Sequence, residues 1–89
     1  MDKPNLKEIR KRAAKMKPGM SIGKGQVSDG VLAEVDRVLD ADEIVKIKFL
    51  RSSDPAKRDE MMAYLVRKTR SELVETRGNT ITLFRARDA

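Results

Sequence analysis

Two groups of residues near the start of the sequence have the types and spacing needed to bind an anion. The first is a row of three lysines, Lys7, Lys11 and Lys15, each four positions from the next. The second is the stretch SIGKGQVSDG at 21–30, in which two glycines flank Lys24. Glycines let a phosphate approach the backbone closely, and the N–H groups of a following helix start attract negative charge. These residue types therefore favour the binding of phosphate groups.

The composition argues against catalysis and metal binding. The chain has no cysteine and no histidine, so the commonest acid/base group at neutral pH and the commonest metal ligands are absent. The glycine spacing fits neither Gly-x-x-x-x-Gly-Lys-Ser/Thr nor Gly-x-Gly-x-x-Gly, which disfavours a nucleotide-dependent enzyme. We therefore expect no enzyme, no cofactor and no small-molecule substrate. The acids nearest the glycine stretch fall at expected helix caps or solvent-facing positions: Asp29, Asp36, Asp40 and Asp42.

The excess positive charge is confined to one end of the chain. The formal net charge is +6, and the first 25 residues hold eight Lys/Arg against two acids, whereas the other 64 hold twelve of each sign. Such asymmetry is typical of a surface that meets a polyanion. A solvated basic helix is the alternative explanation.

Helical spacing of apolar residues predicts a first helix over Pro4–Met16, ended by KPG at 17–19. The lysine row lies opposite the apolar stripe, where like charges four residues apart cost a helix about 0.2 to 0.5 kcal/mol per pair. A bound anion would relieve that repulsion, although solubility also explains lysines on a surface. The expected stripe is Leu6, Ile9, Ala13 and Met16.

Two more helices and four strands complete the expected order. Ser28 is a good N-cap for a helix that runs to about Asp40, and Ser53 or Asp54 caps a third helix with Pro55 in its first turn. We expect an α/β fold, a single small domain over 1–89 in the order α-β-α-β-α-β-β, with a mixed four-stranded sheet. The expected strands are MSIG at 20–23, EIVKIKFL at 43–50, and the two arms of a hairpin around RGN at 77–79.

The run KPGMSIGKGQVSDGVLAEVDRVLDADEIVKIKF, together with RGNTITLFR, resembles the CRM domain, named for chloroplast RNA splicing and ribosome maturation, and most closely its single-domain YhbY-like members. The similarity spans almost the whole chain and keeps the order of its parts. The resemblance implies a fold like the C-terminal domain of translation initiation factor three, binding of RNA, and association with the precursor of the large ribosomal subunit.

In that family a Gly-x-x-Gly loop beside the basic first helix contacts RNA, and the resemblance places this loop on Gly23, Lys24, Gly25 and Gln26. Gln26 stands where the second glycine belongs, with Gly25 displaced by one. A side-chain amide contact from Gln26 could replace the lost backbone approach. Asp42 also replaces a histidine that is common before the EIVK strand.

The aromatic residues point to recognition of phosphate and RNA shape. The aromatic side chains are Phe49, Tyr64 and Phe84, and both phenylalanines lie in expected strands where core packing is their natural role, so a base-stacking platform is not expected. Ordinary surface charge is the better explanation for Lys46, Lys48, Arg85 and Arg87. The candidate RNA-binding residues are Lys7, Lys11, Arg12, Lys15, Lys17, Gly23, Lys24, Gly25 and Gln26.

Two alternatives to a CRM-type RNA binder stay open. Alba-type architectural nucleic-acid-binding proteins share the basic α/β character and an IGK loop, but they begin with the strand. A protein-interaction adaptor is the other alternative, because a basic helix also docks on acidic proteins. The sequence shows neither a membrane span nor the apolar core of a signal peptide, so we expect a cytoplasmic protein that does not engage a membrane.

Overall fold

The structure, a computed structural model, describes residues 5–23, 27–50 and 55–86. The order of its helices and strands is the order expected from the sequence, and its sheet is mixed and four-stranded, so the predicted fold class is confirmed. The elements are α1 (Leu6–Ala14), β1 (Met20–Ile22), α2 (Asp29–Asp42), β2 (Ile44–Phe49), α3 (Pro55–Thr69), β3 (Glu72–Arg77) and β4 (Thr80–Phe84).

The strands are ordered β1-β2-β4-β3, so β2 and β4 are the inner strands. β1 pairs with β2 in parallel, with α2 as the crossover between them, and β4 is antiparallel to both β2 and β3. Gly78 and Asn79 form the two-residue loop of the β3–β4 hairpin. Gly78 has φ of 58° and Asn79 has no positive φ, a pattern that a type II′ turn requires. The predicted hairpin is confirmed.

Side-chain caps set the starts of α1 and α2. Asn5 Oδ1 accepts the N–H of Glu8 at 3.0 Å, and Ser28 Oγ accepts the N–H of Val31 at 3.2 Å. The Ser28 cap was predicted, whereas the Asn5-x-x-Glu8 pattern, a variant of the capping box, was missed. Three residues of the expected helix starts lie outside the described residues: Pro4, Ser53 and Asp54.

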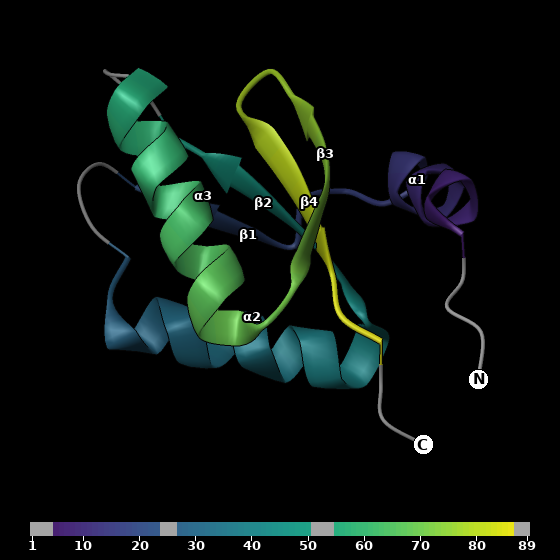
Figure 1. Ribbon diagram of the computed structural model, residues 1–89, viewed down its shortest axis with the longest axis horizontal. Coiled ribbons are helices and arrows are strands. Elements are labelled where there is room, and N and C mark those ends of the chain that lie inside the picture. The colour runs from purple at the N-terminus through teal and green to yellow at the C-terminus, as the bar shows by residue number, and fades with distance from the viewer. Residues whose placement is uncertain (1–4, 24–26, 51–54, 87–89) are drawn as a thin grey trace.

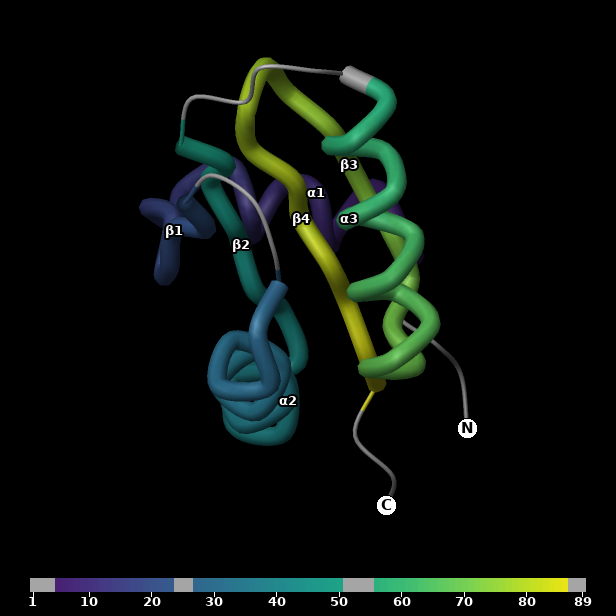
Figure 2. Tube along the Cα trace, turned by 90° about the vertical axis from the view of Figure 1, so that its left-hand side faces the viewer, coloured from purple at the N-terminus to yellow at the C-terminus, as the bar shows by residue number. Residues whose placement is uncertain are grey.

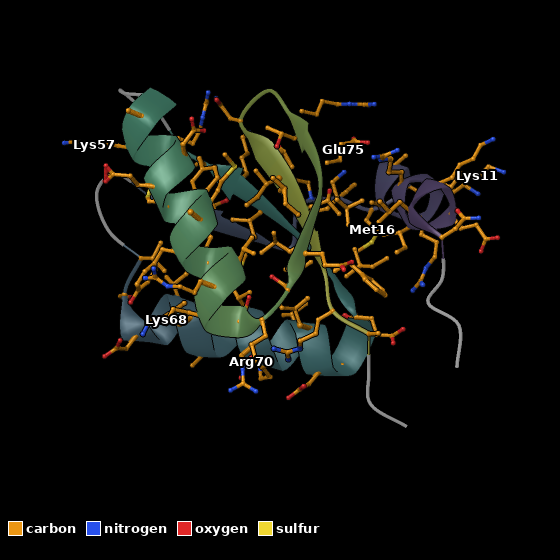
Figure 3. The ribbon with its side chains drawn as sticks, in the orientation of Figure 1. Lys11, Met16, Lys57, Lys68, Arg70 and Glu75 are labelled. Carbon is orange, nitrogen blue, oxygen red and sulfur yellow. The ribbon has the colours of Figure 1, made fainter. Side chains whose placement is uncertain are left out.

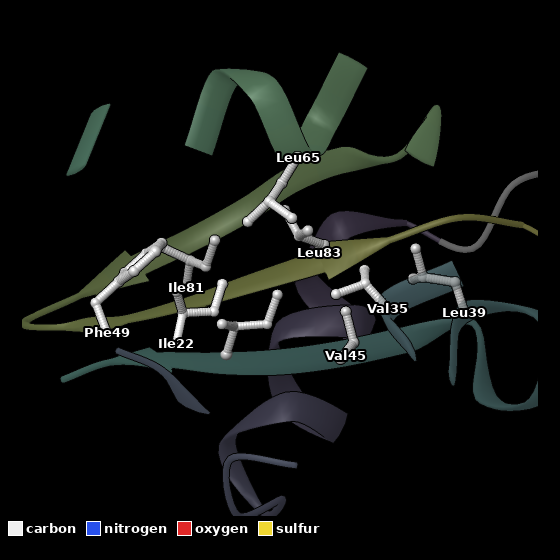
Figure 4. Packing of buried hydrophobic residues seen from close by; sticks show 9 residues of the cluster. Ile22, Val35, Leu39, Val45, Phe49, Leu65, Ile81 and Leu83 are labelled. Atoms are coloured by element: carbon white, nitrogen blue, oxygen red, sulfur yellow. The ribbon is translucent and has the colours of Figure 1, made fainter. Parts of the chain in front are cut away.

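The sheet carries a hydrophobic core on each face, because successive side chains of a strand point to opposite sides. Helices α2 and α3 cover one face and α1 covers the other (Figures 1 and 2). Figure 4 shows the larger core, which consists of Ile22, Val35, Leu39, Val45, Ile47, Phe49, Leu65, Ile81 and Leu83. The smaller core beneath α1 consists of Ile9, Ala13, Ile44, Val74 and Phe84.

Polar contacts hold the middle and the end of α1 against the strands. From the middle of α1, Arg10 Nε donates to the carbonyl of Val74 on β3 at 3.4 Å. At its end Lys46 Nζ, on β2, donates to the carbonyls of Ala13 and Met16, both at 3.0 Å. Helix α1 therefore crosses the sheet from β3 towards β2, as Figure 2 shows behind the strands.

Two apolar residues of the expected elements are exposed. Leu6, the first residue of the predicted stripe, is 44% exposed, while Ile9 and Ala13 are buried. The reason is that β3 is the edge strand, and Arg10 already reaches it, so Leu6 lies one turn earlier at the margin of the sheet. Leu50 is 46% exposed because β2 ends at Phe49.

Replacing Lys46 tests the attachment of α1. A Lys46→Ala substitution leaves two helix-end carbonyls without their charged donor, so we expect the free energy of unfolding to fall by about 1 to 3 kcal/mol. Urea denaturation measures it. Lys48→Ala, on the same strand and face but exposed, is the control and changes stability by less than about 0.5 kcal/mol. Equal effects of the two substitutions would contradict this role of Lys46.

Candidate nucleic-acid interface

The outer face of α1 and the residues just after it form a run of exposed cations. Figure 3 shows Lys11 directed away from the sheet and Met16 directed towards it. Because the buried side of α1 is fixed by Ile9 and Ala13, the lysine row stands on the opposite side, as the sequence predicts. Lys15 is the C-cap residue rather than part of the helix. Arg10 is also exposed but contacts β3, and the other exposed cations, here called the α1 cations, are Lys7, Lys11, Arg12, Lys15 and Lys17.

No α1 cation makes an ion pair within residues 5–23, 27–50 and 55–86. Repulsion between lysines four residues apart costs the helix about 0.2 to 0.5 kcal/mol per pair. Lys11 and Arg12 lie in the last turn, where the helix dipole offsets part of that cost. The face therefore presents uncompensated positive charge to solvent, which attracts a polyanion.

The glycine stretch starts where β1 ends. Gly23 is exposed, it does not have a positive φ, and a Cβ built on it would have no heavy atom within 4 Å. Neither backbone conformation nor crowding therefore explains a glycine at this position. Lys24, Gly25 and Gln26, the rest of the predicted loop, lie outside the described residues.

The α1 cations and Gly23 lie on connected parts of the fold. Lys17 is followed by Gly19, whose N–H donates to the carbonyl of Lys46, and then by the three residues of β1. Gly19 and Gly23 are four residues apart, or about 13 Å along an extended strand. One folded RNA can span a strand of this length, so Lys17 before β1 and Gly23 after it can contact the same ligand.

Two basic residues for which the sequence predicts ordinary surface charge have structural roles instead. Lys46 closes the end of α1. The guanidinium of Arg85 donates to Asp36 Oδ1 at 2.6 Å, to Asp40 Oδ1 at 2.8 Å and to the Thr69 carbonyl at 2.7 Å. The hydrogen bond to Asp36 is the main reason that the pKa of Arg85 is raised. Arg85 therefore ties the end of β4 to α2 and α3 and stays charged.

The two phenylalanines are buried, as the sequence predicts. Phe49 and Phe84 are each 1% exposed. Tyr64 lies on α3, on the face of the sheet opposite α1, and it is half-buried. The Arg67 guanidinium carbon and Lys68 Nζ each lie 5.8 Å from the centre of its ring. No exposed aromatic ring of the described residues therefore lies beside the α1 cations.

Among the described residues, no three or more Asp and Glu side chains come together as metal ligands would. Nor does any helix in the described ranges have the length and hydrophobicity needed to cross a membrane.

A protein-family comparison decides what kind of domain this is. The model of the CRS1 / YhbY (CRM) domain matches residues 1–85. The chain belongs to the CRM domain family. The family resemblance expected from the sequence is thereby confirmed.

Individual relatives of this CRM domain agree with the family match. The "Probable RNA-binding protein YqeI" of Bacillus subtilis (strain 168) is 36% identical over 77 residues, which cover 86% of this chain and 79% of that protein. An "RNA-binding protein" of Haemophilus influenzae is 29% identical over 70 residues, covering 79% and 70%. A hypothetical protein of Staphylococcus aureus, solved in solution, matches with a TM-score of 0.78 and 27% identity over 94% of this chain and 86% of that one.

Substitution by alanine should have opposite effects on the stability of this CRM domain at Gly23 and at Gly78. Gly23→Ala meets no neighbour and no left-handed backbone, so we expect the free energy of unfolding to stay the same or rise by about 0.4 to 1 kcal/mol. Gly78→Ala forces a side chain onto φ of 58° and should lower it by about 1 to 2 kcal/mol. Thermal or urea unfolding of both variants checks this, and destabilisation by Gly23→Ala would mean that the fold itself requires that glycine.

Proposed function

We propose that this CRM domain is a non-enzymatic cytoplasmic protein that binds structured RNA through its phosphate backbone, with ribosomal RNA of the large-subunit precursor as the target. The observation that carries the proposal is the set of α1 cations, which are exposed and have no ion-pair partner among the described residues. The names of the Bacillus subtilis and Haemophilus influenzae relatives support RNA as the ligand class.

The proposed contact surface combines charge with close approach. The α1 cations neutralise phosphates of one stretch of backbone, as lysine and arginine do in most nucleic-acid interfaces. The fold itself does not require a glycine at position 23, because a Cβ there would meet no neighbour. The absence of a side chain at Gly23 instead lets a second phosphate reach the backbone at the end of β1. Three further residues of the proposed surface lie outside the described residues: Lys24, Gly25 and Gln26.

Recognition by backbone and shape fits the side chains on this surface better than recognition of bases. Stacking on unpaired bases needs an accessible aromatic ring. Tyr64 is half-buried, already has two cations against its ring, and lies on the face of the sheet away from α1. We therefore expect affinities that depend on salt and on RNA fold, with little dependence on base identity.

Salt dependence is the direct test of the proposed surface. We expect the logarithm of the affinity for structured ribosomal RNA to fall linearly with the logarithm of salt concentration. Replacing Lys7, Lys11 and Lys15 together by alanine should lower that slope by about 2 to 3, because each phosphate contact contributes about 0.7 to 0.9. Fluorescence anisotropy titrations at several salt concentrations measure it, with Lys24→Ala as a separate variant for the loop.

The matched control removes the same charge from the other side of the molecule. Lys57, Arg67 and Lys68 are exposed on α3, and Figure 3 shows Lys57 and Lys68 on the far side of the molecule from Lys11. Alanine at these three positions should leave the slope unchanged within about 0.5. Equal losses in the two triple variants would mean that net charge alone attracts RNA. If neither the wild type nor the variants bind RNA but the wild type binds an acidic protein, a protein-interaction adaptor is the better explanation.

Gly23 can be tested separately from charge. Gly23→Ala keeps every cation and the fold. Any loss of RNA affinity would therefore show that the methyl group of alanine blocks the approach of a phosphate. We expect the affinity to fall about tenfold, the equivalent of roughly one lost hydrogen bond from a backbone N–H to a charged group. Gly19→Ala is the control, because Gly19 is equally uncrowded and also has no positive φ. The same affinity for both variants would remove Gly23 from the interface.

A further inference from the structure

A row of polar side chains crosses the sheet on the face that α1 covers only in part. The strand registers pair Ser21 with Lys48, Lys48 with Thr80, and Thr80 with Arg77. Directly opposite residues of paired strands point to the same face. Ser21, Lys48, Thr80 and Arg77 therefore form one continuous line over all four strands, here called the sheet strip.

The sheet strip is the uncovered end of that face. The next row along the strands is Lys46, Thr82 and Glu75, in which Lys46 is tied to the end of α1 and Thr82 is buried. In the sheet strip itself, by contrast, three side chains are exposed and Thr80 is half-buried. Figure 3 shows Glu75 at the side of the sheet that faces α1. A ligand can thus reach the sheet strip beside α1 without moving any part of the fold described here.

The charges on the sheet strip are available to a ligand. Lys48 makes no ion pair within residues 5–23, 27–50 and 55–86. Arg77 Nε lies 3.5 Å from a carboxylate oxygen of Glu75, and the Arg77 side chain is 80% exposed. Such exposed pairs contribute little, typically about 0 to 1 kcal/mol, so Arg77 can exchange Glu75 for a phosphate at low cost. The hydroxyls of Ser21 and Thr80 are suited to contacts with phosphate oxygens or ribose 2′-OH groups.

The sheet strip and α1 run side by side. Helix α1 crosses from β3 towards β2, and the sheet strip crosses the same strands. On β4 the residue beneath α1 is Phe84 and the sheet-strip residue is Thr80, four residues apart, which is about 13 Å at the rise of a strand. Two lines of cations that run in the same direction on one face of the molecule suit the two backbones of a duplex better than one single strand.

We propose that the sheet strip binds the sugar–phosphate backbone of a second RNA strand while the α1 cations bind the first, so that the preferred ligand is double-helical RNA. The inference rests on the proposed function and adds the form of the RNA to it. The two lines of positive charge, their common direction and their place on one face of the sheet carry it.

The experiment compares Lys48→Ala with Lys57→Ala, an exposed lysine on α3 at the other face of the sheet. Both variants and the wild type are titrated at several salt concentrations with an RNA duplex and with each of its separated strands. We expect Lys48→Ala to lower duplex affinity about fivefold to tenfold and the salt slope by about 0.9, and to leave single-strand affinity within about twofold of wild type. Lys57→Ala should match the wild type on all three RNAs.

Amide shifts provide a second measurement that does not depend on a substitution. Addition of the duplex to ¹⁵N-labelled wild-type protein should shift the backbone amides of Ser21, Lys48 and Thr80 together with those of α1, whereas a single strand should shift those of α1 alone.

Each failure has its own signature. A wild type that binds none of the RNAs overturns the proposed function and this inference with it. If the α1 variant loses affinity as proposed but Lys48→Ala behaves like Lys57→Ala, the sheet strip alone is overturned. Equal losses by Lys48→Ala on duplex and single strand overturn the two-strand arrangement.

Discussion

The attachment of α1 to its own face of the sheet is the constraint on which the candidate interface depends. Ile9 and Ala13 bury one side of a nine-residue helix, and the Lys46 ammonium binds the carbonyls at its end. A helix this short is marginal in isolation, so tertiary packing must supply its stability. The same attachment fixes which side of α1 faces water, and therefore which lysines a ligand can reach.

This fold separates its basic residues into two kinds. Lys46 and Arg85 bind helix ends and acidic side chains within the molecule, and they link β2 to α1 and β4 to α2 and α3. The α1 cations and Lys48 have no such partner in the described ranges and remain available to a polyanion. Net charge alone does not distinguish these kinds, because a paired arginine and a free lysine count equally in it. The difference lies in the contacts that each side chain makes.

Much of the candidate site was readable from the sequence, and the reason is local. The Lys7 to Lys15 row and its opposition to Ile9 and Ala13 follow from the helical repeat, which depends on near neighbours only. The helix start at Asn5 was missed although its Asn-x-x-Glu pattern is also local. The sheet strip had no such signal, because Ser21, Lys48, Thr80 and Arg77 are far apart in the chain. Strand order and register bring them into one line.

By itself the sequence determined the kind and order of the elements, the Ser28 cap, the hairpin at Gly78 and the concentration of positive charge in the first 25 residues. These features arise from repeats, caps and turns that involve a few consecutive residues. Tertiary structure alone decided that α1 lies on the face opposite α2 and α3, that Leu6 is exposed, and that Lys46 and Arg85 are used internally. Those outcomes depend on which strands become neighbours, and alternation along a strand does not specify which helix will cover each face.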